Sequence, residues 1–324
     1  MIVVTGGAGC IGSAIVWALN KRGITEIILV DDTGHPEKEK NIESLHYFSL
    51  ENKDTFLNYA KKSSMPWEVD TIIHMGGCSS TIERDETFLT TNNLNYTQCL
   101  AEYALNNGVR FIYASSAATY GSGENGFSDE VDITSLSPLN LYAHSKQKFD
   151  LWAQAQGAFD HIVGLKFFNV FGPSEYHKKE MQSMGRRGIL QVLDNGKIRL
   201  FKSHNPGYAD GDQERDFLYV KDAVQMVLFF LDSPKINGIF NAGTGVARTW
   251  NELTVAVFKA MGREIAVEYI DMPVSIRDQF QYRTCAKIDK IRKAGYSQKI
   301  TTLEEATTDY IQNYLLSNKR LGDE

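Results

Sequence analysis

Cysteine is scarce in this sequence: four occur in 324 residues, and no two of them form a Cys-x-x-Cys pair. None has the spacing to histidine that is typical of a zinc site, so no metal is expected. A disulfide framework is not expected either. The thiols of Cys10, Cys78, Cys99 and Cys285 instead fit a reduced, cytoplasmic protein in which they are buried or simply unoxidised.

Long apolar runs are also missing. The longest, Ala223–Leu231, is interrupted by Gln225 and falls far short of the roughly 18–20 residues that a membrane span needs. A strand pattern already starts at Ile2, so we expect no signal peptide. The net charge of −6 comes from interleaved acids and bases, which argues against a nucleic-acid surface. We therefore expect neither a membrane nor a nucleic acid as a partner.

What the sequence does have is an alternation of short apolar runs and helical patterns. This alternation is typical of an α/β protein with a parallel sheet covered on both faces, and it predicts a Rossmann-type, doubly wound fold. The expected strands are Ile2–Val4, Glu26–Val30, Asp70–His74, Phe111–Ala114 and His161–Phe168, and the expected helices are Ser13–Lys21, Asn93–Asn107 and His144–Gln156.

The pattern loosens after Asn169, where a loop rich in glycine and charge, Asn205–Arg215, precedes another apolar run. Gly238–Gly243 has the character of a strand that returns to the main sheet. We therefore expect a dinucleotide-binding domain of residues 1–169 plus about 217–244. Residues of about 170–216 plus 245–324 would form a smaller, discontinuous α/β lobe that binds substrate.

A glycine-rich turn follows the first strand. Gly6 permits a tight turn, Gly9 lets the backbone approach a pyrophosphate, and Gly12 lets the helix pack closely on the strand. The start of the following helix then faces the phosphates with its partial positive charge. An ordinary turn of an α/β protein is the alternative, but the strand–turn–helix context favours a dinucleotide site.

Asp31 ends the second strand, where an acid normally accepts hydrogen bonds from ribose hydroxyls and favours NAD. Lys38 and Lys53 follow, and they could neutralise the 2′-phosphate of NADP or lie on the solvated surface. The spacing alone leaves NAD and NADP both open.

Tyr142 and Lys146 are four residues apart and share one face of a helix. A nearby ammonium and an oxidised nicotinamide would both lower the pKa of the tyrosine, so that it could act as a base. Ser116, at the end of a strand, could bind the reacting hydroxyl, or it could simply cap a turn. Tyr-x-x-x-Lys also arises by chance, but its position after this strand favours a catalytic set of Ser116, Tyr142 and Lys146.

These residues resemble the extended short-chain dehydrogenase/reductase superfamily, which acts on nucleotide sugars. Within it, the chain is similar to the family of 6-epimerases for ADP-heptoses along nearly its whole length. The matching segments are Thr5–Gly9, His74–Thr81, Ala114–Gly121, Pro138–Tyr142, Phe168–Pro173, His177–Lys178, Arg215–Val220 and Phe240–Gly245.

The resemblance implies that tightly bound NADP takes a hydride from carbon 6 of ADP-D-glycero-D-manno-heptose and returns it to the other face. The product would be the L-glycero epimer, a precursor of the lipopolysaccharide core. Tyr142 would be one base and Lys178 the other, and Lys178 would need a depressed pKa. The alternative for Lys178 is a phosphate-binding or surface lysine. The resemblance also implies a homo-oligomer, possibly a pentamer.

The same resemblance implies which residues bind the ligands. Arg215 would clamp the diphosphate, unless it pairs structurally with Asp216 or Asp222. Around the cofactor it implies Gly6, Gly9, Cys10, Ile11, Gly12, Asp31, Asp32, Lys38, Lys53, Met75, Gly76, Gly77, Cys78, Ser79, Asn92, Tyr142, Lys146, Val170 and Lys178. Around the substrate it implies Ser79, Ser116, Asn169, Glu180, Arg187, Phe201, Lys202, Ser203, His204, Arg215 and Phe280.

The chain departs from the family pattern at Cys10, Met75, Ser174 and Phe280, which bears on the details of substrate binding. A UDP-hexose 4-epimerase is the alternative enzyme, distinguished by its use of a tyrosine without a second lysine base. A 4,6-dehydratase fits less well, because Ser116-Ala-Ala118 stands where an acid is needed. A non-catalytic, dinucleotide-binding regulator is the alternative of another class, although such proteins usually lose the tyrosine or the lysine.

Overall fold

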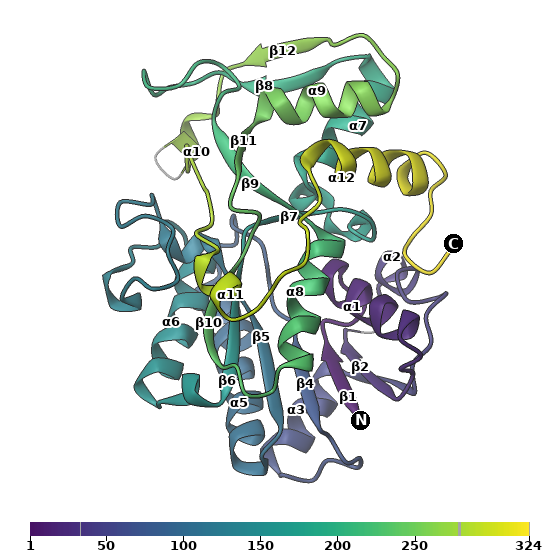
Figure 1. Cartoon of the computed structure of the whole chain (residues 1–324), viewed down its shortest axis with the longest axis vertical. Helices are drawn as coiled ribbons and strands as arrows, with labels where there is room; N and C mark the ends of the chain where they lie inside the picture. The colour runs from purple at the N-terminus through teal and green to yellow at the C-terminus, as the bar shows by residue number, and fades with distance from the viewer. Residues whose placement is uncertain (33, 278–279, 324) are drawn as a thin grey trace.

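The computed structural model describes residues 1–32, 34–277 and 280–323, with the side chains at 179–181, 184 and 275 left out of the description. Its main element is a seven-stranded parallel sheet in the order β10-β6-β5-β4-β1-β2-β3 (Figure 1). The strands are β1 (Ile2–Thr5), β2 (Ile27–Asp31), β3 (Ser49–Asn52), β4 (Thr71–His74), β5 (Arg110–Ser116), β6 (Ile162–Phe167) and β10 (Gly238–Ala242).

Helices cover both faces of this sheet, as the alternation of elements predicts. Val3 and Val4 are adjacent on β1 and point to opposite faces, so that Val3 packs with Phe56 and Leu100 and Val4 with Ile15. The helices are α1 (Cys10–Lys21), α2 (Pro36–Glu39), α3 (Lys53–Lys61), α4 (Glu86–Leu89), α5 (Tyr96–Asn107), α6 (Leu141–Ala155), α7 (Met184–Asn195), α8 (Val220–Asp232), α9 (Trp250–Ala260), α10 (Val274–Arg277), α11 (Asp289–Lys293) and α12 (Leu303–Asp309).

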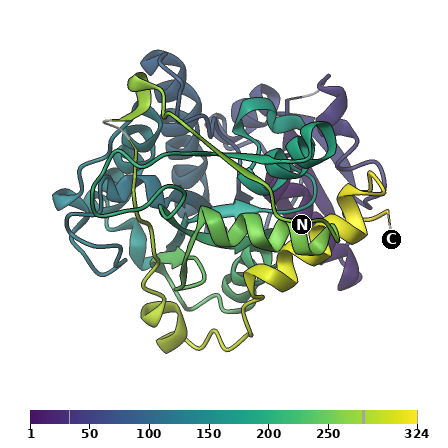
Figure 2. The same ribbon diagram turned by 90° about the horizontal axis from the view of Figure 1, so that it is seen from above.

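Two smaller sheets lie beyond the carboxyl ends of the main strands, in the upper half of Figure 1. One has the order β11-β9-β7 and the other pairs β12 with β8. Figure 2 shows α9 and α12 from above, side by side over the main sheet. The strands of the two smaller sheets are β7 (Asn169–Phe171), β8 (Ile198–Phe201), β9 (Glu214–Tyr219), β11 (Ala247–Thr249) and β12 (Val267–Ile270).

The α/β class and the doubly wound sheet predicted from the sequence are confirmed, but some boundaries differ. Helix α6 starts three residues before the predicted His144, because the side chain of Asn140 caps it by accepting from the backbone N–H of Ala143. Strand β3 was not predicted, since its residues are only half-buried and show no apolar alternation. The division into two lobes stays a prediction, although the position of β10 in the main sheet supports it.

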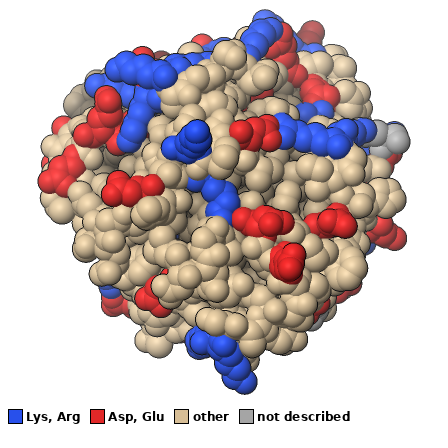
Figure 3. Space-filling model, turned by 60° about the horizontal axis from the view of Figure 1, so that its bottom comes forward, with Lys and Arg blue, Asp and Glu red and all other residues tan. Residues whose placement is uncertain are grey.

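Charged side chains of both signs are interspersed on the face shown in Figure 3. In the described ranges, no helix combines the length and hydropathy of a membrane span. The described residues also contain no group of three or more histidine, cysteine, aspartate or glutamate side chains suited to a metal ion.

A buried carboxylate joins the main sheet to the smaller ones. Asp216 on β9 is fully buried and accepts from the backbone N–H groups of Thr244, Gly245 and Ala286 at 2.7–3.0 Å. It also accepts from the hydroxyl of Thr244 at 2.8 Å. Three chain segments are therefore held by one side chain.

We expect Asp216→Ala to lower the free energy of unfolding by about 3 kcal/mol, because it leaves several buried N–H groups without an acceptor. Asp232→Ala is the matched control. Asp232 pairs with Arg22 on the surface, where its loss should cost less than about 1 kcal/mol. Urea denaturation followed by circular dichroism measures both values, and equal losses would contradict the role given to Asp216.

Candidate active site

The glycine-rich turn lies against the loop after β4. A Cβ atom on Gly12 would lie 2.1 Å from the carbonyl oxygen of Gly6, and one on Gly6, where φ is +65°, would lie 2.7 Å from the nitrogen of Gly76. Glycine is therefore required here by the protein's own backbone. Gly9 caps α1 without a side chain, which leaves the start of the helix open toward a cavity.

This first cavity has a volume of about 430 Å³ and lies along the carboxyl edge of the main sheet. Ligands of open α/β sheets bind at this edge. The structure brings together here most of the predicted cofactor residues: Gly6, Gly9, Cys10, Ile11, Gly12, Asp31, Asp32, Lys38, Lys53, Met75, Gly76, Gly77, Cys78, Ser79, Asn92 and Lys178.

Two acids and two lysines form ion pairs at the far end of this cavity. Lys38 Nζ lies 2.7 Å from Asp31 Oδ1, and Lys53 Nζ lies 3.1 Å from Asp32 Oδ2. Asp31 also accepts from the backbone N–H of Ala8 at 2.9 Å. Both lysines thus border the cavity, and neither is simply solvated surface.

A second cavity of about 710 Å³ adjoins the first, because Lys178 and the segment 75–79 line both. Residues from the smaller sheets form its far wall. Besides the predicted cofactor residues that it shares with the first cavity, the second cavity is lined by the predicted cofactor residues Tyr142, Lys146 and Val170. The predicted substrate residues that line it are Ser79, Ser116, Asn169, Arg187, Phe201 and Phe280.

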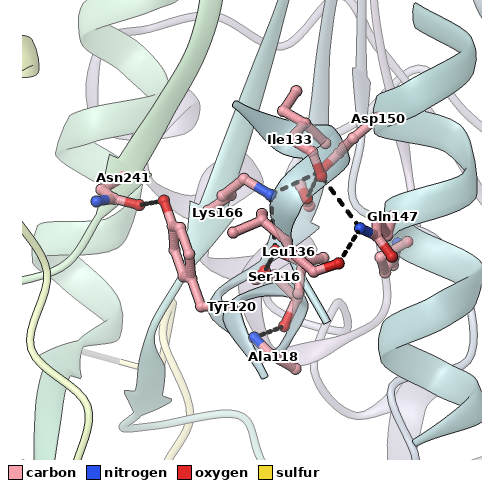
Figure 4. A network of polar contacts seen from close by, with 12 residues as sticks. Ser116, Ala118, Tyr120, Ile133, Leu136, Gln147, Asp150, Lys166 and Asn241 are labelled. Atoms are coloured by element: carbon pink, nitrogen blue, oxygen red, sulfur yellow. Dashed lines mark hydrogen bonds and ion pairs between the residues drawn. The ribbon is translucent and has the colours of Figure 1, made fainter. Parts of the chain in front are cut away.

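Ser116 and Tyr142 are in contact at the centre of this second cavity. Ser116 ends β5, and its hydroxyl accepts from the backbone N–H of Ala118 at 3.1 Å, so it does cap a turn (Figure 4). It also hydrogen-bonds the hydroxyl of Tyr142 on α6. Lys146, one turn further along α6, donates to the carbonyl oxygen of Ala114 at 2.9 Å. The predicted set is therefore assembled on one wall.

The protonation of this set differs from the expectation. Burial raises the pKa of Tyr142, and the hydrogen bond from Ser116 lowers it by less. Burial also lowers the pKa of Lys146 to about 8. The protein alone thus does not depress the pKa of Tyr142, because burial disfavours the charged form of both groups.

Lys178 follows β7 on a short 3₁₀ turn and lies beside Cys10 and Glu175. Burial disfavours its charge, but the Cys10 sulfur and the Glu175 carboxylate outweigh burial and raise the pKa of Lys178. The surroundings of Lys178 therefore act against the depressed pKa that it would need to serve as a base. Glu175 is itself fully buried and accepts from the hydroxyls of Ser183 at 2.6 Å and Tyr310 at 3.0 Å.

Arg215 on β9 is buried beneath aromatic rings. Its guanidinium carbon lies 5.0 Å from the ring centre of Phe280 and 5.6 Å from that of Trp250. Burial lowers its pKa to about 10. Asp216 and Asp222, the predicted alternative partners, instead accept from Thr244 and Thr301, so the structure offers no support for those ion pairs.

Several predicted substrate residues do not line either cavity. Lys202 pairs with Asp271 at 3.3 Å, Ser203 donates from its backbone to Asp210, and the backbone N–H of His204 donates to Tyr282. Arg215 is also outside both linings. The side chain of Glu180 lies outside the described part of the chain. The roles of these residues stay predictions.

The structure adds lining residues that sequence reasoning missed. Asn140 belongs to the Pro-Leu-Asn-x-Tyr motif, so its place beside Tyr142 had a signal in the sequence. His177 in the first cavity and Phe217 in the second also belong to matching segments, His177–Lys178 and Arg215–Val220. Other lining residues lie outside every matching segment and reach the cavities through the tertiary fold; they include Phe88 and Tyr96 in the first, and Trp250, Leu253, Ile276, Gln281 and Thr284 in the second.

Known proteins are similar to this chain in sequence and in fold. The ADP-L-glycero-D-manno-heptose-6-epimerase of Nitratidesulfovibrio vulgaris (strain DP4) is 51% identical over 316 residues, which cover 97% of this chain and 98% of that protein. The crystal structure of the Helicobacter pylori enzyme of the same name has a TM-score of 0.81 at 26% identity and covers 96% of this chain and 95% of that one.

The UDP-glucose 4-epimerase of Thermus thermophilus, solved in complex with NAD, is also similar, with a TM-score of 0.75 and 26% identity over 96% of this chain and 98% of that one. Residues 2–243, which include β1 to β10 and the Tyr142–Lys146 pair, match a single family model, the NAD-dependent epimerase/dehydratase family. This chain belongs to the NAD-dependent epimerase/dehydratase family.

Proposed function

We propose that this protein converts ADP-D-glycero-D-manno-heptose into its L-glycero epimer by oxidation and re-reduction at carbon 6. The observation that carries the proposal is that Tyr142 and Lys178, which come from different elements, both line the second cavity, which adjoins the first. If the ketone is presented by its other face between the two hydride transfers, its oxygen meets a different part of the cavity, and two separate groups can each serve one orientation as the proton-transfer group. The 51% identity to a 6-epimerase supports the same substrate.

Each residue of the site has a distinct part in this proposal. Ser116 holds the reacting hydroxyl and the Tyr142 hydroxyl in one hydrogen-bonded line. Lys178, whose raised pKa keeps it protonated, first acts as an acid toward the ketone oxygen. Arg215 lies behind Phe280 and Trp250, which line the second cavity, and supplies a cation for the diphosphate, because a guanidinium matches the geometry of a phosphate.

We propose NADP as the cofactor that the first cavity holds. The open start of α1 and the glycines that exclude side chains fit a pyrophosphate, and Lys38 and Lys53 fit a 2′-phosphate. Bound nicotinamide supplies the capacity to accept a hydride and to return it. Lys146 orients the nicotinamide ribose from α6.

The cell context and the assembly are also part of the proposal. All four cysteines are free, which suits a reducing cytoplasm. The product would serve the synthesis of the lipopolysaccharide core. A homo-oligomer, with a pentamer as the specific expectation, rests on the family resemblance, and light scattering of the purified protein tests it.

The proposed activity is tested by incubating the purified protein with ADP-D-glycero-D-manno-heptose and following the configuration at carbon 6 by NMR. The L-glycero epimer should accumulate without added cofactor, because the cofactor is retained from expression. An untouched heptose together with epimerised UDP-galactose would overturn the proposal in favour of a 4-epimerase.

Tyr142→Phe and Lys178→Met should each block the oxidation of one epimer far more than that of the other. Each variant removes the proton-transfer group on one face, and loss of such a group costs about 10²–10⁴-fold in rate. Reduction of the bound nicotinamide, followed by its absorbance after mixing with one epimer at a time, measures this asymmetry. Tyr103→Phe on the outer side of α5 is the control, and equal losses for both epimers would contradict the two-base assignment.

Lys53→Met should weaken NADP binding by roughly tenfold or more and leave NAD binding almost unchanged. The variant removes a cation and also leaves the Asp32 carboxylate unpaired, which repels a 2′-phosphate. Isothermal calorimetry on protein stripped of cofactor measures both affinities. Lys62→Met, at the exposed end of α3, is the control, and a parallel loss for both cofactors would argue against a 2′-phosphate contact.

A further inference from the structure

The ammonium of Lys146 is buried with little to balance its charge. Lys146 is only 7% exposed, and its ammonium donates a hydrogen bond to a neutral acceptor, the carbonyl oxygen of Ala114. A buried ammonium without a nearby anion tends to lose its proton. Lys146 therefore needs a source of negative charge if it is to stay a cation at neutral pH.

Asp150 is the carboxylate placed to supply that charge. It lies four residues after Lys146 on α6, so that both side chains share one face of the helix. It is fully buried and accepts from the hydroxyls of Tyr113 and Ser115, each at 2.7 Å. These two residues alternate along β5 and point to the same side.

Lys166 on β6 holds Asp150 in place from the other side. Its Nζ donates to Asp150 Oδ2 at 2.8 Å and to the hydroxyl of Thr119 at 2.6 Å (Figure 4). Thr119 in turn donates to the backbone carbonyl oxygen of Ser116 at 2.8 Å. The Lys166–Asp150 ion pair is thus connected by hydrogen bonds to Ser116 at the end of β5.

Other titratable groups around Lys146 contribute little negative charge. Burial raises the pKa of the Cys78 thiol and that of Tyr142, so both are neutral at neutral pH. His74 on β4 is also neutral, since burial lowers its pKa to about 3. Tyr113 stays protonated as a donor to Asp150. Among the groups whose charge raises the pKa of Lys146, Asp150 has the largest effect.

We propose that Asp150, anchored by Lys166, is a positioning residue that provides the counter-charge for the Lys146 ammonium. The two lysines and the one carboxylate together carry a net charge of +1 inside the protein. That surplus favours a negative charge on the neighbouring Tyr142 hydroxyl. The relevance of this to turnover rests on the proposed function; the arrangement of charge does not.

Asp150 and Lys166 should shift the pKa of Lys146 in opposite directions. Asp150→Asn removes the anion and should lower the pKa of Lys146 by about one unit. Lys166→Met frees the carboxylate from its competing cation and should raise the pKa of Lys146 by a similar amount. A network that is merely structural would loosen the site in both variants and shift Lys146 the same way.

The test measures Lys146 directly and needs no substrate. The full-length protein, stripped of cofactor, is trace-labelled with acetic anhydride across a range of pH, and mass spectrometry of the Lys146 peptide gives the midpoint of its reactivity. Lys146 lines the second cavity, so the reagent can reach it. Opposite shifts of the midpoint in Asp150→Asn and Lys166→Met support the proposal, and equal midpoints or shifts of the same sign overturn it.

Two further variants separate this effect from loss of stability. Lys166→Arg keeps the cation and should leave the midpoint unchanged. Asp222→Asn alters another buried carboxylate, one that accepts from Thr301, and should not move the midpoint of Lys146. Opposite midpoint shifts in a protein that does not epimerise ADP-heptose would support this inference and reject the proposed function.

Discussion

The close approach of the β1 and β4 ends is the constraint on which the whole site depends. Thr5 joins them, because its hydroxyl bonds His74 Nδ1 at 2.5 Å and its carbonyl oxygen accepts from the Met75 N–H at 3.0 Å. A Cβ on Gly77 would lie 2.9 Å from Asn93 Oδ1 and 3.6 Å from Lys146 Nζ. A larger residue in these loops would push the glycine-rich turn and the first cavity away from α6.

The sequence predicted those parts of the site in which residues close together in the chain also lie close together in space. The glycine turn, Asp31 and the Tyr142–Lys146 pair depend on strand ends and helix spacing, and the structure places them as expected. The surroundings of Lys178 were not predictable in this way. Its neighbour Cys10 lies at the start of α1, far earlier in the chain. Whether burial or neighbouring charge decides the pKa of Lys178 depends on distances that no sequence spacing reveals.

The same limit applies to the substrate side of the fold. The strand pattern predicted the parallel sheet because buried strands carry apolar runs, whereas β3, β11 and β12 are largely half-buried and carry a weaker signal. The aromatic rings around Arg215 come from α9 and from Phe280, far along the chain. A motif could suggest the arginine, but only the tertiary fold shows that rings and not carboxylates surround it.

The buried Glu175 has a consequence for how the protein is made. Its hydrogen bond to Tyr310 joins residues 135 positions apart. Most residues that line the first cavity lie between Thr5 and Tyr96. During synthesis, this part of the cavity can form from the first strands and helices to emerge. The support behind Lys178 must wait until the chain has grown past residue 310. A ribosome-bound chain could therefore capture its cofactor well before it becomes competent to turn over a sugar.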